Sequence, residues 1–167
     1  MAKSEKQKLK LLYIIQCLME KTDEEHAVTT QEIIDYLALQ GITAERKSIY
    51  TDIDLLIDFG MDIIKKPGRS GGYTLASRQF ELAELKLLVD AVQSSKFITT
   101  KKSRELIGKL ETLCSKYEAT QLHRQVVVTN RNKAVNENIY YNVDIIYNAI
   151  AENVKIQFQY FEWNVSK

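Results

Sequence analysis

The chain has 167 residues, of which 45% are hydrophobic and 27% are charged, a composition typical of soluble globular proteins. Its 23 Lys and Arg residues and 22 Asp and Glu residues give a net charge of +1, which neither favours nor excludes a nucleic-acid partner. No apolar run approaches the roughly 20 residues of a transmembrane helix, and the basic N-terminus lacks the apolar core of a signal peptide. We therefore expect a cytoplasmic protein that does not bind membranes.

The cysteines and histidines do not form a reactive or metal-binding pattern. Cys17 and Cys114 each fall on an apolar helical stripe, and two cysteines are too few for a disulfide framework or a zinc site, so we expect both in the core. His26 and His123 lie among polar residues without a second ligand at metal-binding spacing, so we expect both on the surface. No nucleophile–base pair or phosphate-binding loop appears either. We expect no enzyme activity, no cofactor and no metal.

The first predicted helix covers Lys6 to Glu20, where apolar residues recur with a period of 3.6. The acidic segment KTDEEHA after it is expected to be a solvated loop. A second helix begins at Thr29, because Thr29 and Glu32 have the T-x-x-E spacing of a capping box. Gly41 ends this helix, since glycine tolerates the left-handed conformation that closes a helix.

The third predicted helix is AERKSIYTDIDLLIDFG, with Thr43 as its N-cap and Gly60 at its end. Apolar residues at positions 49, 53, 56 and 57 share one face, which we expect to be buried. Asp52 is expected to have an intramolecular role and to pair with a basic neighbour. The opposite face presents side chains that can reach base edges or phosphates: Glu45, Arg46, Lys47, Ser48, Tyr50 and Thr51.

Two cations, Arg46 and Lys47, stand at the start of this helix, where positive charge opposes the helix dipole. On a purely structural surface nothing offsets this unfavourable interaction. If the helix approaches phosphate groups, the attraction between the cations and the phosphates offsets it. Arg46 can also bind guanine through two N–H groups. The alternative interpretation, an ordinary solvated helix start, remains open.

Two short strands, Asp62–Lys65 and Gly72–Leu75, are predicted around the turn segment KPGRSGG. The tip carries three cations that suit the DNA backbone or minor groove, Lys65, Lys66 and Arg69. An ordinary surface loop is the alternative for this segment alone. Helix, turn, helix and hairpin in this order predict a winged helix-turn-helix. The recognition helix, about 44–59, would enter the major groove, and the wing, about 63–75, would touch the backbone or minor groove.

The charge balance of residues 1–75 also supports an alternative function for the winged helix. From Met1 to Leu75, 10 Lys and Arg residues stand against 12 Asp and Glu residues, so a DNA-binding domain must gather its cations on one face. The alternative is a winged helix that binds a partner protein without reading DNA directly.

The second half is predicted to be mainly helical, with helices at Gln79–Ser95 and at about Lys101–Tyr117. Their apolar stripes must pack on each other, on the winged helix or on another chain. A β-prone run, Gln125–Thr129, comes next, and a helix is predicted at Ile139–Glu152. The alternation of Val154–Phe161 predicts a strand, which needs a partner strand.

Three segments resemble the WYL-domain transcriptional regulators, also called DeoR-type or helix-turn-helix type 11 proteins. They are RKSIYTDIDLLIDFG, DIIKKPGRSGGYTL and IYYNVDIIYNAIAENVKIQFQYFEWN. Thr51 stands where the family often has a second arginine. The resemblance implies a mostly α fold with a small β part: a winged helix-turn-helix at 1–77, a helical linker and dimerisation region at 78–137, and the start of a truncated WYL sensor domain at 138–167.

The combined prediction is a sequence-specific transcriptional regulator. It would bind double-stranded DNA as a homodimer, so that two recognition helices meet two half-sites. By the resemblance, the missing part of the WYL domain would bind an effector ligand. The predicted DNA-binding residues are Arg46, Lys47, Ser48, Tyr50, Thr51, Lys65, Lys66 and Arg69.

Overall fold

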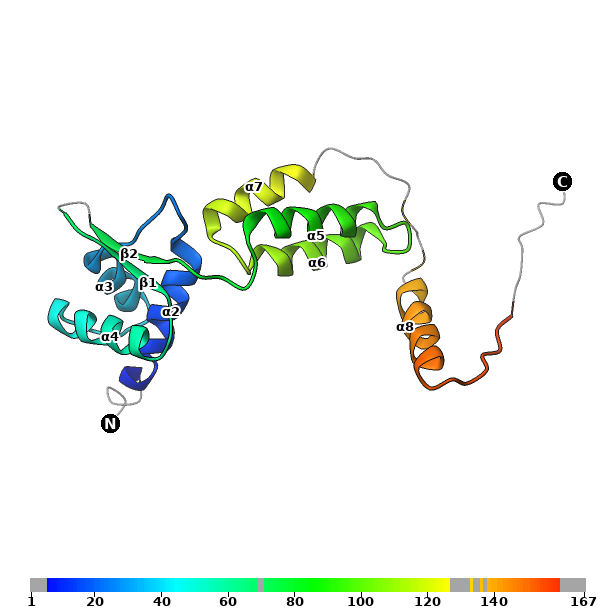
Figure 1. Ribbon diagram of the computed structural model, residues 1–167, viewed down its shortest axis with the longest axis horizontal. Coiled ribbons are helices and arrows are strands. Elements are labelled where there is room, and N and C mark those ends of the chain that lie inside the picture. The colour runs from blue at the N-terminus through cyan, green and yellow to red at the C-terminus, as the bar shows by residue number, and fades with distance from the viewer. Residues whose placement is uncertain (1–5, 69–70, 127–132, 134–135, 137, 160–167) are drawn as a thin grey trace.

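The computed structural model describes residues 6–68, 71–126, 133, 136 and 138–159 (Figure 1). The elements in chain order are α2 (Lys10–Lys21), α3 (Thr30–Leu39), α4 (Arg46–Asp58), β1 (Ile63–Lys66), β2 (Gly72–Leu75), α5 (Leu82–Ser94), α6 (Thr100–Glu111), α7 (Lys116–Val126) and α8 (Asn138–Ala151). Residues 6–8 are also helical. The fold is mostly helical with a small two-stranded antiparallel sheet, as the sequence predicted.

The start and end of α3 follow the predicted capping chemistry. The Thr29 hydroxyl accepts a hydrogen bond from the Glu32 amide at 3.2 Å, and the Glu32 carboxylate accepts one from the Thr29 amide at 2.7 Å. Both bonds satisfy amides that the helix itself leaves free. Gly41 has a φ of 74°, the left-handed conformation expected after the last turn.

The start of α4 differs from the prediction. Ile42 is buried in the core and the chain stays non-helical from 42 to 45, so the helix begins only at Arg46. Glu45, and not Thr43, is the N-cap residue, and its side chain makes no capping hydrogen bond. The Thr43 carbonyl instead accepts a hydrogen bond from the Gln7 side chain at 3.0 Å. The predicted end is confirmed, because Gly60 follows the helix with a φ of 104°.

The two strands form the predicted hairpin, with β1 shifted by one residue, and pair from Ile63 with Leu75 to Lys66 with Gly72. An isolated bridge joins β2 to the loop before α3, where the Val28 and Tyr73 backbones exchange hydrogen bonds of 3.0 and 2.8 Å. Gly72 lies beside this bridge, and a Cβ added there would stand 2.4 Å from the Val28 carbonyl oxygen. Only glycine fits this close backbone approach.

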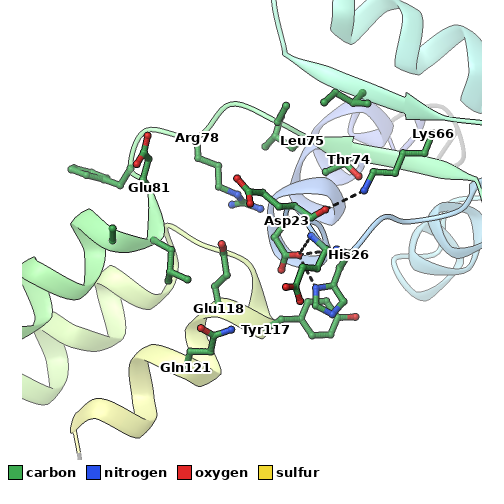
Figure 2. Close-up of a pocket in the computed structure, with 17 residues that line it drawn as sticks. Asp23, His26, Lys66, Thr74, Leu75, Arg78, Glu81, Tyr117, Glu118 and Gln121 are labelled. Atoms are coloured by element: carbon green, nitrogen blue, oxygen red, sulfur yellow. Dashed lines mark hydrogen bonds and ion pairs between the residues drawn. The ribbon is translucent and has the colours of Figure 1, made fainter.

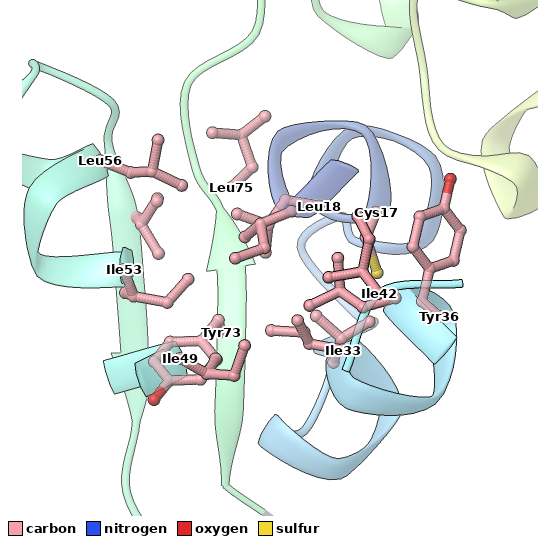
Figure 3. Close-up of a cluster of buried hydrophobic side chains, with 14 residues drawn as sticks. Cys17, Leu18, Ile33, Tyr36, Ile42, Ile49, Ile53, Leu56, Tyr73 and Leu75 are labelled. Atoms are coloured by element: carbon pink, nitrogen blue, oxygen red, sulfur yellow. The ribbon is translucent and has the colours of Figure 1, made fainter. Parts of the chain in front are cut away.

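A first hydrophobic cluster joins α2, α3, α4 and the hairpin (Figure 3). Ile14 and Leu18 of α2 are fully buried, and Cys17 lies between these apolar neighbours, so its predicted core position is confirmed. Burial raises the pKa of the Cys17 thiol to about 11. The other buried members are Val28, Ile33, Tyr36, Leu37, Ile42, Ile49, Ile53, Leu56, Ile63, Tyr73 and Leu75.

A second cluster joins α5, α6 and α7, which Figure 1 shows side by side. Its buried residues are Leu85, Val89, Ile107, Cys114 and Leu122. The predicted single helix from Lys101 to Tyr117 is wrong, because α6 ends at Glu111 and α7 begins at Lys116. The break has a local cause, since the Ser115 hydroxyl and the Glu118 carboxylate each accept a hydrogen bond from the other residue's amide, which starts a new helix.

The last described segments match the prediction only in part. Helix α8 is confirmed, but Gln125 and Val126 belong to α7, and residues 127–129 of the predicted β run lie outside the described residues. Residues 154–159 form no strand, because no second strand lies beside them in the described part of the chain; 160 and 161 fall outside it. No helix among the described residues is long and apolar enough to cross a membrane.

Candidate nucleic-acid interface

Helix α4 is held by its apolar face, which buries Ile49, Ile53 and Leu56 in the first cluster. The opposite face is therefore turned to solvent. Its first half presents Arg46, Lys47, Tyr50 and Thr51, all exposed. These are four of the predicted DNA-binding residues, and the helix brings them onto one surface.

Two of these side chains also make contacts within the fold. The Arg46 guanidinium donates a hydrogen bond to the Gln31 side-chain oxygen of α3 at 3.3 Å, which directs it toward the start of that helix. The Thr51 hydroxyl donates to the Lys47 carbonyl at 3.3 Å, one turn earlier in α4. Both contacts are long and exposed, so they orient the side chains without removing them from a partner's reach.

Ser48 does not share this exposed face. It is half-buried, and its hydroxyl accepts a hydrogen bond from the Lys10 amine of α2 at 2.5 Å. The same amine lies 2.6 Å from the Asp52 carboxylate, so the intramolecular pairing predicted for Asp52 is confirmed. Lys10 thus ties α2 to the side of α4 and neutralises a carboxylate that would otherwise repel phosphate.

The wing cations are also engaged. Lys65 forms an ion pair with Asp54 of α4, and this hydrogen bond raises the pKa of Lys65 above its ordinary value. The Lys66 amine donates to the Glu24 backbone carbonyl at 3.2 Å. Arg69 lies outside the described residues. The wing is therefore connected to α4 on one side and to the acidic loop on the other.

The result is an uneven distribution of charge along α4. Its carboxylates Asp52 and Asp54 face lysines, whereas Arg46 and Lys47 have no carboxylate partner among the described residues. Two exposed cations, Arg46 and Lys47, therefore stand against one exposed carboxylate, Glu45, which leaves net positive charge at the start of the helix. Such a surface favours an anionic partner.

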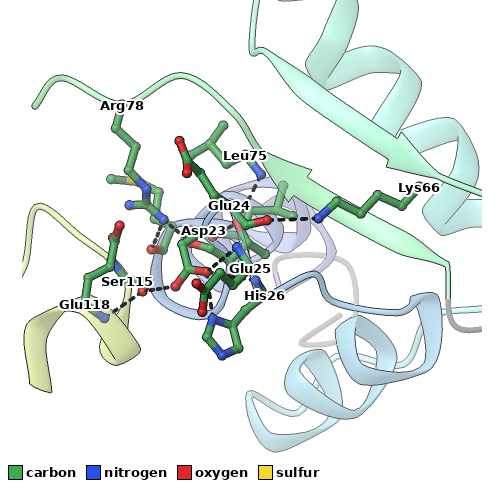
Figure 4. Close-up of polar contacts among 12 residues, drawn as sticks. Asp23, Glu24, Glu25, His26, Lys66, Leu75, Arg78, Ser115 and Glu118 are labelled. Atoms are coloured by element: carbon green, nitrogen blue, oxygen red, sulfur yellow. Dashed lines mark hydrogen bonds and ion pairs between the residues drawn. The ribbon is translucent and has the colours of Figure 1, made fainter. Parts of the chain in front are cut away.

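A second polar region, termed the joint below, comprises Asp23, His26, Arg78 and Ser115 (Figure 4) together with Tyr117 (Figure 2). Asp23 is only 7% exposed, so the prediction of a solvated loop is wrong for this residue. Its carboxylate accepts hydrogen bonds from the Ser115 hydroxyl at 2.5 Å and from the His26 ring at 2.7 Å. It also accepts bonds from the amides of Glu25 and His26 at 3.0 and 2.8 Å.

These contacts determine the charge state of Asp23. Burial raises the pKa of the carboxyl, but the hydrogen bonds from Ser115, from the His26 ring and from the two amides outweigh burial. The net pKa therefore lies below the ordinary value. Asp23 is a charged, fully bonded group inside the structure.

The remaining contacts of the joint attach α7 to the loop after α2, and the segment before α5 to the end of α2. The rings of His26 and Tyr117 stack with centroids 3.7 Å apart and planes 7° from parallel. Arg78 donates to the backbone carbonyls of Met19 and Thr22 at 2.8 and 2.5 Å. The sequence offered one signal for this region, the S-x-x-E spacing of Ser115 and Glu118, which repeats the capping pattern of α3.

A cleft of about 780 Å³ lies beside the joint, between the outer face of the hairpin, the start of α5 and α7 (Figure 2). Ile64, Lys66 and Thr74 line it from the hairpin. Its acidic lining residues are Asp23, Glu24, Glu25, Glu81 and Glu118. Because these carboxylates repel phosphate, the cleft is a poor place for nucleic acid, and the start of α4 is the better candidate.

Comparison with known proteins concerns the first part of the chain. Residues 12–68, about a third of the chain, match the family model described as "FokI, D3 domain", a domain of DNA-binding type. The match extends from α2 through α4 and β1 to the turn of the wing. No curated protein and no solved structure matches the chain. The comparisons do not show a WYL or DeoR-type family. Among the described residues, no group of three or more His, Cys, Asp or Glu side chains is arranged to hold a metal ion.

Proposed function

We propose that the chain binds duplex DNA by placing the first half of α4 in the major groove. One observation carries the proposal. Arg46, Lys47, Tyr50 and Thr51 are exposed together at the start of α4, while the nearest carboxylates of the same helix face lysines. The match of residues 12–68 to a domain of DNA-binding type supports the same conclusion.

The proposed contacts follow from side-chain chemistry. Arg46 reads a guanine through two N–H groups, and its bond to Gln31 gives it a defined starting direction. Lys47, Tyr50 and Thr51 contact phosphates or base edges. Ser48 contributes only if its bond from Lys10 breaks.

The wing contributes backbone contacts in this proposal through Lys65, Lys66 and Arg69. DNA must then replace Asp54 as the partner of Lys65 and the Glu24 carbonyl as the partner of Lys66. Exchanging one charged or polar partner for another yields little net free energy. We therefore expect the wing lysines to add less to affinity than Arg46 and Lys47.

The biological role that we propose is transcriptional regulation of the WYL, DeoR-type kind. It rests on the resemblance of three sequence segments, of which the last covers α8 from Ile139 onward. In this proposal the protein binds two half-sites as a homodimer and responds to an effector ligand held by a WYL domain. It has no catalytic activity of its own, so supercoiled plasmid incubated with the protein and Mg²⁺ should remain uncut.

The first prediction concerns Arg46. Sites selected from a random DNA pool should share a short motif, and Arg46→Ala should weaken binding to that motif by about 10- to 100-fold, because a bidentate base contact is worth about 1–3 kcal/mol. Preference at one base position should also relax. Fluorescence anisotropy with the selected duplex and its single-base variants measures both effects.

Arg104→Ala is the matched control for this prediction. Arg104 is exposed on α6, outside the proposed interface, so its removal deletes the same charge and leaves base preference unchanged. If Arg46→Ala keeps wild-type affinity and base preference, α4 does not read DNA through this residue.

A second candidate function is docking of a partner protein on α4. Leu55, in the second half of the helix, and Phe59, its C-cap residue, are 51% and 82% exposed, and large exposed apolar side chains are common at protein interfaces. The two functions differ in salt dependence. DNA binding should weaken steeply as salt rises, whereas absence of DNA binding even at low salt would favour the protein partner.

A further inference from the structure

The helical turn at residues 6–8 lies against the connection between α3 and α4. The Gln7 side chain donates to the Thr43 carbonyl at 3.0 Å, which fixes this turn beside the start of α4. The Lys6 amine lies over Gly41, since a Cβ added to that glycine would stand 2.9 Å from the amine nitrogen. Two contacts from adjacent residues thus place the turn on the helix-turn-helix connection.

This position brings a further cation to the connection that precedes α4. Thr43 precedes Arg46 by three residues, and a chain of that length spans at most about 11 Å. Lys6 is exposed and has no carboxylate partner among the described residues. Lys6 therefore adds an exposed positive charge at the helix-turn-helix connection on the side of Gly41, whereas Arg46 is directed toward the start of α3.

We propose that Lys6 is a phosphate-binding residue of the DNA interface, contacting the duplex backbone beside the connection while α4 occupies the major groove. This inference rests on the proposed DNA binding. It assigns a role to a residue outside the helix-turn-helix and the wing. Lys6 positions the protein on the backbone and carries no base preference.

A structural role makes a different prediction for the same residue. A cation over Gly41 also lies near the C-terminal end of α3, where positive charge stabilises the helix dipole. If that were the whole role, removing the amine would lower the stability of the free protein and leave the salt dependence of DNA binding unchanged. The two roles are therefore separable by measurement.

The test compares Lys6→Gln with Lys8→Gln in the full chain. Lys8 is exposed in the same turn, two residues along and hence on roughly the opposite side of the helix, so it provides an equal charge change away from the connection. Affinity for the selected duplex is measured across a series of salt concentrations. Each phosphate contact contributes about 0.9 to the slope of log K against log salt.

We expect Lys6→Gln to reduce that slope by about 0.9 and to weaken all sequences alike, and Lys8→Gln to leave the slope unchanged. Equal slopes for Lys6→Gln and wild type, or equal reductions for both variants, would overturn the inference. If the wild-type protein showed no salt-dependent DNA binding, the proposed function itself would be wrong. Failure of the inference is therefore distinguishable from failure of the function, because Arg46→Ala still reports on DNA reading when Lys6 has no role.

Discussion

The joint around Asp23 and the start of α4 are both charged, but their charges are satisfied in different ways. Asp23 is 7% exposed and accepts four hydrogen bonds, from Ser115, from the His26 ring and from two backbone amides. Arg46 is exposed and donates one long bond to the neutral side chain of Gln31. The Asp23 carboxylate is satisfied by its own contacts, whereas Arg46 retains unused donors on an exposed surface.

The difference separates a residue that maintains the fold from one that can serve a partner. A buried carboxylate is well tolerated when its hydrogen bonds are complete, so Asp23 has little capacity to bind a new ligand. Exposed cations at a helix start oppose the helix dipole, so they contribute little to the stability of the protein without a partner. Removing a side chain from the joint should therefore reduce stability, and removing one from the start of α4 should reduce binding.

Asp23→Ala is expected to have the largest effect on stability. The substitution leaves the Ser115 hydroxyl, the His26 ring and two amides without their acceptor, and hydrogen bonds to a charged group contribute about 1.5–3 kcal/mol. We expect the free energy of unfolding to fall by about 3 kcal/mol. Urea denaturation followed by circular dichroism measures the change.

Asp54→Ala is the control for that prediction, because it also removes a carboxylate that has a polar partner, in this case Lys65. Asp54 and Lys65 have side chains that are 59% and 52% exposed, and exposed ion pairs contribute little to stability. We expect a urea midpoint close to that of wild type. If Asp54→Ala lost as much stability as Asp23→Ala, the distinction between the two regions would be wrong.

Ser115→Ala should have an intermediate effect. The hydroxyl donates to Asp23 and accepts from the Glu118 amide, so its loss removes one bond of the joint and the cap of α7. Loss of such a cap costs about 1 kcal/mol, and the missing donor to Asp23 adds a similar amount. We expect a loss of roughly 2 kcal/mol in urea denaturation, with DNA affinity retained where the protein is folded. An unchanged midpoint would show that α7 is held without this contact.

The winged helix-turn-helix order was predictable because its signals are local. Apolar periodicity placed α2, α3 and α4, and the Thr29–Glu32 spacing located the start of α3. Gly41 and Gly60 marked two helix ends through their backbone conformations. Each signal lies within a few residues of the feature that it predicts.

The joint was not predictable in this way, because its contacts span long distances in the sequence. Asp23 reads as part of an acidic, solvated run, and its burial depends on Ser115, 92 residues later. The break between α6 and α7 was missed for a local reason. The apolar stripe continues through Leu113 and Cys114, which masked the S-x-x-E signal that begins the next helix.

The smallest predicted effect is the pH dependence of the joint. The pKa of Asp23 lies below its ordinary value of 3.8, because its hydrogen bonds outweigh burial. A carboxyl with a lowered folded-state pKa stabilises the protein above its unfolded pKa and loses that contribution as pH falls through the folded value. The stability advantage of wild type over Asp23→Asn should therefore be constant at neutral pH and shrink below about pH 4. Direct titration of the Asp23 carboxyl by ¹³C NMR should give a midpoint below 3.8. A midpoint above 3.8 would mean that burial outweighs the bonds from Ser115 and His26, and that the Asp23 carboxylate is less completely satisfied than its geometry indicates.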